Sequence, residues 1–565
     1  MFLPTTPEEI KTLQWDKLDI ILLTGDAYID SPFIGVSVIG HILLDAGFRV
    51  GIIAQPDIRG LHDITRLGIP RLFWGVTGGC IDSMVANYTA TKKKKHQDDM
   101  TPGGKNIRRP DRALSVYTRL IRSLPVGDKV PIVLGGLEAS LRRVVHYDYW
   151  DDRLHRSILC DAPADYLLYG MADKAILEVA DRLRQKKDPR EIRGLAYLSD
   201  VPGQSFLEMP SFENVVTDKG VFRQMFHLFY ENSNPLRGKG LFQKQDHRYL
   251  IQNPPPLPLS PKDLDKIYQL PFEYDVHPFH KKQGSVKALE TIRFSITTHR
   301  GCYGECSFCA ITVHQGQIIQ ERSETSVMAE AARLTKHPCF KGYIHDIGGP
   351  TANMYGTGCK NNNRHRCQRR CLYPRICPLL SADHGRQRNL LARIRKIREV
   401  QKAFIASGIR YDLILHDEKN GVHYLRDILR HHTSGQMKVA PEHAADAVLR
   451  LMKKPAAEKL LLFKELFDRL NQSLHQKQFL TYYFIAAHPG CRNEDMLLLR
   501  RFITRYLKTN PEQVQIFTPL PSTYSSVMYY TQQDPFTGKH VFVEKDMGKK
   551  EKQKNILMAP SGRLR

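Results

Sequence analysis

The alternation of apolar runs with amphipathic stretches divides the chain into two regular parts and a less regular stretch between them. In the first part, apolar runs at 19–24 and 49–54 flank residues 34–46, whose apolar positions recur at helical spacing. Further runs at 71–74, 130–134 and 165–169 each lead towards glycines. Strands that alternate with helices predict a parallel, Rossmann-like α/β sheet with its ligands beyond the carboxyl ends of the strands.

From about 186 to 286 the periodicity weakens. Short alternating pieces at 214–217 and 247–251 predict a few extended strands, and residues 252–261 contain a stiff, proline-rich run. We expect this region to be a connector between two domains.

The last large part shows six strand–helix units. Its predicted strands cover residues 292–298, 343–347, 411–416, 436–440, 479–486 and 513–517. The predicted helices cover 326–336, 388–407, 421–432, 442–473 with an interruption at Pro455, and 493–508. Six such units predict an open partial (β/α)6 barrel, in which chemistry occurs at the carboxyl ends of the strands.

Composition narrows the class of protein. A chain of 565 residues is too long for one ordinary core. No run of about eighteen apolar residues indicates a membrane helix, and the N-terminus lacks the layout of a signal peptide. Eight of the eleven cysteines lie between Cys302 and Cys377, which favours metal binding in a reducing compartment, the cytoplasm.

The charge is strongly basic. The formal net charge is +24, from 83 basic and 59 acidic residues, which raises the local concentration of anionic partners. Residues 91–112, with four consecutive lysines, are expected to form a solvated or mobile inserted loop, with a phosphate clamp as the functional alternative. Residues 546–565 are expected to form a basic, mobile tail.

The most informative motif follows the predicted strand 292–298. Cys302, Cys306 and Cys309 have the spacing C-x3-C-x2-C. Three thiolates on one short loop cannot complete a tetrahedral zinc site, but they can hold three irons of a cubane cluster and leave the fourth open. A zinc knuckle completed by another residue is the structural alternative.

With the aromatic Phe308 before its last cysteine, this motif resembles the signature of radical S-adenosylmethionine (SAM) enzymes. The resemblance implies a [4Fe-4S] cluster on Cys302, Cys306 and Cys309, whose open iron chelates SAM, and an electron donor of flavodoxin or ferredoxin type. Phe308 would then contact the adenine. Gly348, Gly349 and Pro350 match the family's glycine-rich motif, whose backbone meets the methionine amino group.

Short motifs at 25–32, 55–57, 348–355, 488–491 and 528–531 are spread over nearly the full chain. With them the chain looks most like YgiQ-type radical SAM proteins. This resemblance implies a cobalamin-binding-type domain at 1–185, the connector at 186–286, and a radical SAM core at 287–545 with a cysteine-rich insertion at 355–380. The Asp-x-His-x-x-Gly motif that supplies the lower cobalt ligand is absent, and His41 lies within a predicted helix. Bound cobalamin is therefore not expected.

A second cysteine group lies in the insertion at 355–380. Its four thiols occur within nineteen residues among arginines, which favour thiolates, and the segment has little apolar content with which to fold: Cys359, Cys367, Cys371 and Cys377. We predict a metal-stapled loop, with zinc or an auxiliary iron–sulfur cluster as the metal and free thiols as the alternative.

Together these patterns predict a radical SAM enzyme that acts on an anionic substrate, such as tRNA or a phosphorylated metabolite. The motifs identify neither the reaction nor a catalytic side chain. The alternative from another class is a basic nucleic-acid-binding protein whose cysteines bind structural metal.

Overall fold

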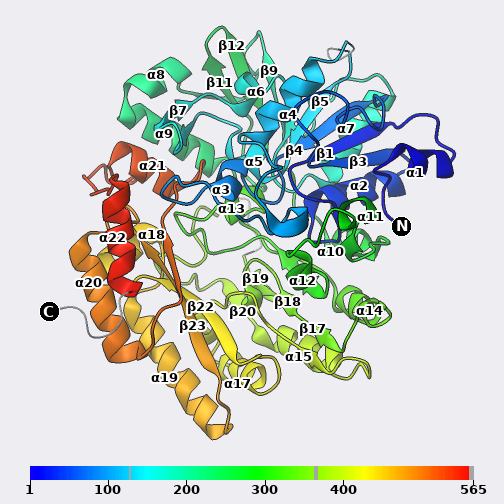
Figure 1. The fold of residues 1–565 in the computed structure, drawn as a ribbon. Coiled ribbons are helices and arrows are strands. Elements are labelled where there is room, and N and C mark those ends of the chain that lie inside the picture. Colours follow the sequence, from blue (N-terminus) through cyan, green and yellow to red (C-terminus); the bar gives the residue numbers. More distant parts are fainter. Residues whose placement is uncertain (126–128, 362–366, 559–565) are drawn as a thin grey trace. The chain divides into compact units, whose positions relative to one another are not determined.

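The chain folds into two compact units. The computed structural model describes residues 1–125, 129–361 and 367–558 (Figure 1). One unit comprises Met1–Pro258 and Lys266–Arg293, and the other comprises Leu259–Asp265 and Phe294–Arg565. Within the described ranges, no helix has the length and apolar character needed to cross a membrane.

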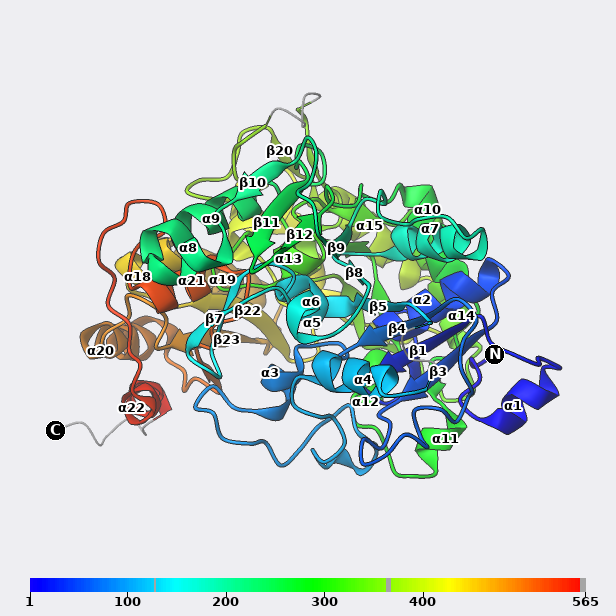
Figure 2. The same ribbon diagram turned by 90° about the horizontal axis from the view of Figure 1, so that it is seen from above.

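A nine-stranded sheet forms the centre of the first unit. Five of its strands are parallel, in the order β3 (Val50–Ala54), β1 (Ile20–Thr24), β4 (Phe73–Thr77), β5 (Ile132–Gly135) and β8 (Tyr166–Leu168). Helices α2 (Gly35–Asp45) and α7 (Asp173–Arg184) pack against each other, and α4 (Ala113–Arg122) lies on the opposite side of the strands (Figure 2). The predicted Rossmann-like sheet is confirmed, and its strand order reverses between β1 and β4.

Residues 186–258, interpreted from sequence as a connector, continue this sheet. Beyond β8 come β9 (Leu195–Ser199), β12 (Arg248–Gln252), β11 (Leu241–Gln245) and β10 (Leu207–Met209). Neighbouring strands from β8 to β11 pair antiparallel. The strand expected at 214–217 is wrong, because helix α8 (Phe212–Thr217) begins there with the Ser211 side chain capping the amide of Asn214.

The expectation of a solvated or mobile loop at 91–112 holds only in part, because Lys93 and Lys94 are exposed but other residues of the segment are anchored. Asp98, Thr101 and Arg109 are buried, and the Arg109 guanidinium lies 3.1 Å from the Asp98 carboxylate. The Gln55 amide donates a 2.7 Å hydrogen bond to the Thr101 hydroxyl. The segment packs through polar contacts rather than apolar ones, so its low apolar content did not reveal its order.

Charged side chains fill the edge of the sheet where β1, β4 and β5 end. Asp26 follows β1, forms an ion pair with Arg109 and accepts a 2.6 Å hydrogen bond from the amide of Cys80, which follows β4. Arg142 lies 2.8 Å from Asp82 and 2.6 Å from Asp148. Folds of this kind bind ligands where the strand order reverses. In this protein, ion-paired side chains of the chain itself bridge that position.

Glu138 belongs to the same buried edge and gives the first unit a pH dependence. Its side chain is 1% exposed, and burial, together with nearby Asp82, raises its pKa to about 7. The pKa of a glutamate in the unfolded chain is about 4.3, so the folded state binds the proton of Glu138 more tightly than the unfolded state does. The folded unit therefore loses stability as the pH rises from about 4.5 to 7, and the full destabilisation by the ionised Glu138 carboxylate is present above pH 7.

Glu138→Gln is therefore expected to stabilise the first unit at pH 8, by up to about 3 kcal/mol, and to have little effect at pH 5. All three tryptophans, Trp15, Trp74 and Trp150, belong to this unit, so tryptophan fluorescence during urea unfolding reports on it. The exposed Glu178 on α7 provides the control Glu178→Gln. An equal effect of Glu138→Gln at both pH values would contradict the assignment.

Six parallel strands build the second unit in chain order. They are β14 (Ser295–Thr297), β17 and β18 (Tyr343–Ile344 and Asp346–Gly348) as one interrupted strand, β21 (Lys402–Ala403), β22 (Gln436–Glu442), β23 (Phe479–Ala486) and β24 (Gln513–Ile516). Parallel pairing joins each strand to the next, through the single bridge Ile409–Val439 between the third and fourth. The predicted partial (β/α)6 barrel is confirmed.

The helices between these strands lie largely where the periodicity places them. They are α14 (Glu324–Thr335), α15 (His384–Ile394), α17 (Gly421–His431), α18 (Asp446–Met452), α19 (Ala457–Ser473) and α20 (Asn493–Phe502). Pro455 lies between α18 and α19, so the predicted interruption is confirmed.

The third strand is the exception. Residues 411–416 form helix α16 (Tyr411–His416), and the predicted helix 388–407 ends at Ile394. The strand lies at 402–403 instead, where the Phe404 amide donates to the Ile344 carbonyl at 2.9 Å. A short apolar run fits either element, and here pairing with the neighbouring strand decided between them.

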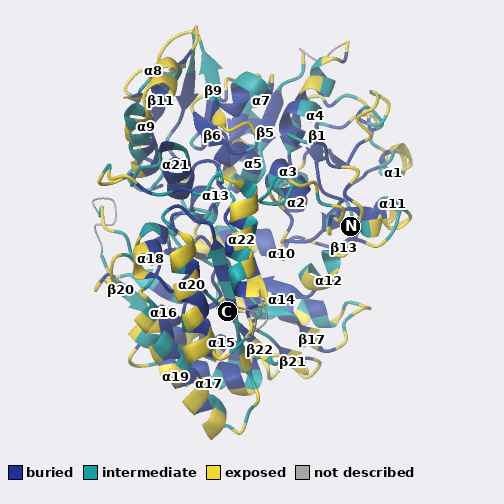
Figure 3. Ribbon diagram, turned by 60° about the vertical axis from the view of Figure 1, so that its left-hand side comes forward, coloured by how far each residue is buried: buried dark blue, intermediate teal, exposed yellow. Residues whose placement is uncertain are grey.

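The basic tail is a docked helix. Helix α22 (Met547–Met558) packs against α20 (Figure 3). Its residues Lys550, Gln553 and Leu557 are buried. Lys550 Nζ donates to the Tyr529 hydroxyl at 2.7 Å, and Gln553 Oε1 accepts from the Ala487 amide at 2.9 Å. The expected mobile tail is thus corrected for residues 547–558, while 559–565 lie outside the described residues.

Candidate active site at the cysteine loop

The loop that carries Cys302, Cys306 and Cys309 follows β14 and a short ladder of β15 (His299–Arg300) with β16 (Gln320–Glu321). Gly301 starts the loop at φ +84°, and a Cβ there would lie 2.2 Å from the Ile318 carbonyl oxygen, so this position requires glycine. The Ser307 amide donates to the Met452 carbonyl at 3.0 Å, and the Ser525 amide donates to the Ser307 carbonyl at 2.9 Å. The loop is therefore anchored from α18 and from α21 (Tyr524–Thr531).

Hydrogen-bond donors surround the sulfur atoms. The Gly304 amide lies 3.3 Å from Cys302 Sγ, and Thr351 Oγ1 lies 3.4 Å from the same sulfur. Arg410 Nη1 lies 3.9 Å from Cys306 Sγ. Donors and a guanidinium aimed at sulfur stabilise thiolates, which are the form that binds metal.

Burial acts in the opposite direction. Burial raises the pKa of the Cys302 and Cys309 thiols, and the neighbouring Cys306 adds to the effect. Three thiolates crowded on one buried loop thus lack sufficient positive charge from the protein alone. A cationic metal centre would supply it, so the donor set and its surroundings fit an iron–sulfur cluster.

The predicted glycine-rich motif lies beside this loop. Gly348 ends β18, and its carbonyl accepts a 2.7 Å hydrogen bond from the Thr298 amide. At Gly349 a Cβ would lie 2.7 Å from both the ring and the carbonyl oxygen of His299. Thr351, one residue beyond Pro350, reaches Cys302. The structure therefore brings Gly348, Gly349 and Pro350 against the cysteine loop.

His299 holds the two segments together as a neutral ring. It is fully buried, and burial lowers its pKa to about 4. Its Nε2 donates to the Thr351 carbonyl at 3.1 Å, and its Nδ1 then accepts from the Thr298 hydroxyl at 2.9 Å. The imidazole thus fixes the turn after Gly349 without adding a charge.

The ends of later strands complete the surroundings. Phe308 makes an edge-on contact with His488, which follows β23, at 6.2 Å between ring centroids. Burial lowers the pKa of His488 to about 3, and its Nε2 lies 2.7 Å from the Ser525 hydroxyl. Glu442, at the end of β22, is buried, lies 3.7 Å from Lys454 and has a raised pKa because of burial. Carboxyl ends of several strands thus gather near the cysteine loop, as predicted.

Sequence patterns missed two cationic residues here. Arg410 is buried, forms a 2.6 Å ion pair with Asp412, and its amide donates to Asn353 Oδ1 at 2.8 Å. Lys453 Nζ lies 3.9 Å from the centre of the Tyr524 ring, and burial lowers its pKa to about 6. Arg410 and its partner Asn353 are 57 residues apart in the chain, so no local spacing could have identified their contact.

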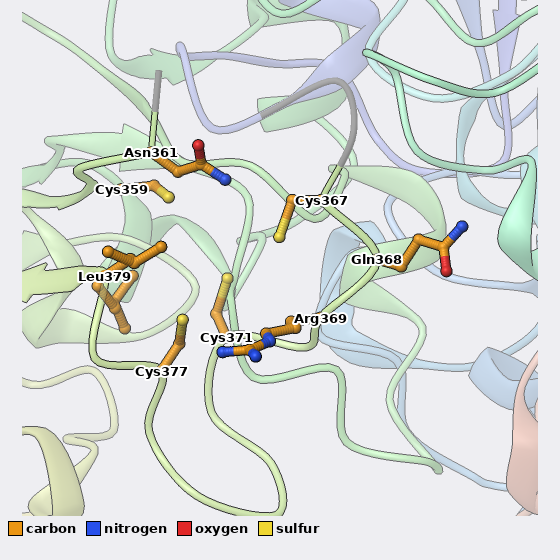
Figure 4. Close-up of a pocket in the computed structure, with 9 residues that line it drawn as sticks. Cys359, Asn361, Cys367, Gln368, Arg369, Cys371, Cys377 and Leu379 are labelled. Carbon is orange, nitrogen blue, oxygen red and sulfur yellow. The ribbon is translucent and has the colours of Figure 1, made fainter. Parts of the chain in front are cut away.

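The second cysteine group lines one cavity of about 480 Å³. The four sulfur atoms point into a common space (Figure 4). Burial, Glu305 and the other three thiols raise the pKa of Cys371 to about 12. The fold therefore brings Cys359, Cys367, Cys371 and Cys377 together; of the arginines noted nearby in the sequence, Arg364 and Arg366 lie outside the described residues.

Another cluster of potential ligands, Asp148, Asp151 and His155, lies in the first unit. Arg112 lies 2.9 Å from Asp148 and 2.8 Å from Asp151, and Arg142 also pairs with Asp148. These ion pairs already satisfy the carboxylates, so the cluster is structural.

Comparison with known proteins identifies the family. The family model described as "Radical SAM N-terminal" matches residues 2–295. A UPF0313 protein of Fusobacterium nucleatum is 53% identical over 558 residues, which cover 98% of each chain. A UPF0313 protein of Thermotoga maritima is 48% identical over 569 residues, which cover 100% of each chain.

Two solved structures share the fold at low sequence identity. The radical SAM methyltransferase TsrM from Kitasatospora setae, with tryptophan and a SAM analogue bound, aligns with a TM-score of 0.50 and 14% identity over 90% of this chain and 75% of that one. The cobalamin-dependent SAM radical enzyme OxsB, with aqua-cobalamin bound, aligns with a TM-score of 0.50 and 12% identity over 91% and 55%. The family model and the relatives confirm the interpretation as an enzyme. The chain belongs to the UPF0313 family of radical SAM enzymes.

Proposed function

We propose that Cys302, Cys306 and Cys309 hold a [4Fe-4S] cluster and that SAM binds its open iron beside Gly348, Gly349 and Pro350. When bound and reduced, this cluster supplies the electron that cleaves SAM into methionine and a 5′-deoxyadenosyl radical. The observation that carries the proposal is the approach of the glycine-rich turn to the cysteine loop, where the Thr351 hydroxyl lies 3.4 Å from Cys302 Sγ.

The chain's own residues then have distinct parts. Arg410 and the Gly304 amide direct positive charge at the sulfurs of Cys306 and Cys302. His299, neutral and buried, fixes the turn whose backbone would meet the methionine amino group. Phe308, which packs against His488, would contact the adenine.

We also infer that the first unit does not bind cobalamin. Asp26, Arg109 and the Cys80 amide bridge the crevice between β1 and β4 where a cofactor would enter. His41 is buried inside α2, with its Nε2 2.8 Å from the Asp30 carboxylate. A histidine held in this way does not serve as a cobalt ligand without breaking a buried hydrogen bond.

The substrate is inferred to be anionic, with tRNA or a phosphorylated metabolite as the class. The support is the net charge of +24 and the exposed basic residues Lys360, Arg369 and Arg375 around the second cysteine group. Electrons would come from a flavodoxin or ferredoxin. We infer a cytoplasmic location, which the clustering of the cysteines supports.

One experiment tests both the proposed cluster and the proposed anionic substrate. Anaerobic protein with dithionite and SAM should form 5′-deoxyadenosine slowly, and total tRNA or a pool of phosphorylated metabolites should raise the rate. If phosphate neutralisation drives binding, the logarithm of the affinity for a single strand should fall with that of the salt concentration by about 0.7 per contact. Absence of basal 5′-deoxyadenosine would overturn the cluster proposal, and stimulation that salt leaves unchanged would overturn the anionic substrate.

A further inference from the structure

We propose that Cys359, Cys367, Cys371 and Cys377 bind a second [4Fe-4S] cluster, distinct from the one proposed at the cysteine loop. Their four sulfur atoms surround one cavity in the second unit (Figure 4). The proposal rests on how the backbone holds these thiols, on the size of the space between them, and on their surroundings.

Regular backbone contacts fix three of the four ligands. Cys359 ends β19 (Thr357–Cys359), which pairs antiparallel with β20 (Leu380–Ala382). The Cys377 amide donates to the Cys371 carbonyl at 2.8 Å and closes the turn between these two cysteines. The Leu380 amide donates to the Cys377 carbonyl at 2.9 Å, which ties that turn to the strand pair. The thiols are therefore held in a framework, with Cys367 facing them across the cavity.

The space between the sulfurs favours a cluster over a single ion. Tetrahedral zinc at about 2.3 Å from each thiolate would draw the four sulfurs to about 3.8 Å from one another and leave no hollow. Here no three of the four sulfurs, all of them on described residues, lie within 4.8 Å of one another, and the cavity that the cysteines line with five other residues measures about 480 Å³. Four thiolates around such a space match the ligand set of a cubane cluster. Arg369, which also lines the cavity, would balance part of the negative charge of a thiolate-bound cluster.

The second site adjoins the first. Leu372, Cys377 and Leu380 form one buried apolar cluster with Tyr303, Met354 and Leu413, and Cys302 and Cys371 pack against it. Both cysteine sets thus contact the same apolar core, and Glu305 of the first loop acts electrostatically on Cys371. Two reduced clusters this near should couple magnetically.

The decisive protein is the triple variant Cys302→Ala/Cys306→Ala/Cys309→Ala, reconstituted anaerobically with iron and sulfide. It should retain about four irons and four sulfides per chain, against about eight of each in the wild type. Adding Cys371→Ser should reduce both to background. The exposed Cys339 belongs to neither group, so Cys339→Ala should keep the wild-type content. In the reduced wild type, the electron paramagnetic resonance spectrum should show coupling that the triple variant lacks.

A triple variant that holds zinc, or that holds neither iron nor sulfide, would overturn the proposal. To guard against misfolding of that variant, Cys371→Ser alone should keep about four irons, yet be cleaved faster by trypsin after Arg369, Arg370 or Arg375. An iron content and a rate of proteolysis in Cys371→Ser equal to those of the wild type would also contradict the second cluster. Failure of the function proposed for Cys302, Cys306 and Cys309 would appear differently, as absent 5′-deoxyadenosine with the iron of the second site intact.

Discussion

Alanine at any one of Cys302, Cys306 and Cys309 is expected to abolish 5′-deoxyadenosine formation. Each thiol lies on the same short loop, whose backbone is held by the Met452 carbonyl and the Ser525 amide. Two remaining thiolates do not anchor a cubane that must keep one iron open for SAM. The measurement is chromatographic detection of 5′-deoxyadenosine from anaerobic protein with dithionite and SAM, together with iron and sulfide content.

Cys339→Ala is the matched control, because Cys339 is an exposed cysteine of the same unit. It should leave both the product and the iron content at wild-type levels. Product formation that survives in all three loop variants would contradict the cluster assignment. Loss of product with unchanged iron would instead show that the loop binds SAM without holding a cluster.

Gly349→Ala is expected to weaken SAM binding about tenfold to a hundredfold. The added Cβ would lie 2.7 Å from the ring and the carbonyl oxygen of His299, and the carbonyl is backbone that cannot turn aside. Overpacking of this kind costs about 1–3 kcal/mol, and each 1.4 kcal/mol corresponds to about tenfold in affinity. The measurement is the dependence of 5′-deoxyadenosine formation on SAM concentration.

The control is Gly408→Ala. The Gly408 carbonyl accepts a 3.0 Å hydrogen bond from the Ala352 amide, so it borders the same turn, yet a Cβ at Gly408 would meet nothing within 4 Å. This variant should bind SAM as the wild type does, and both variants should keep their iron. Equal SAM affinity in Gly349→Ala and wild type would show that the turn is not part of the SAM site.

The sequence alone was sufficient where the information is local. The spacing of Cys302, Cys306 and Cys309, the aromatic Phe308 and the two glycines at 348 and 349 lie within short segments, and the structure brings these segments together. Five of the six barrel strands and most of the helices also follow from periodicity, because one buried face imposes a regular repeat on each element.

Only the tertiary structure decided the elements whose stability comes from distant partners. The run at 411–416 is helical because the strand position beside Ile344 is taken by Ala403. Strands β9 to β12, within residues 195–252, extend the sheet because β8 leaves a sheet edge to be paired. The basic segment 547–558 is a docked helix because Tyr529 and Ala487 satisfy its buried polar groups.

The same reason explains the site residues that local patterns did not reveal. Arg410 reaches Cys306 across 104 residues of sequence, and it is positioned by Asn353 from a different strand end. The four thiols of the second group share one cavity only because β19 and β20 pair. Cysteine spacing within a loop thus identified the chemistry, whereas contacts between segments far apart in the chain determined which charges surround it.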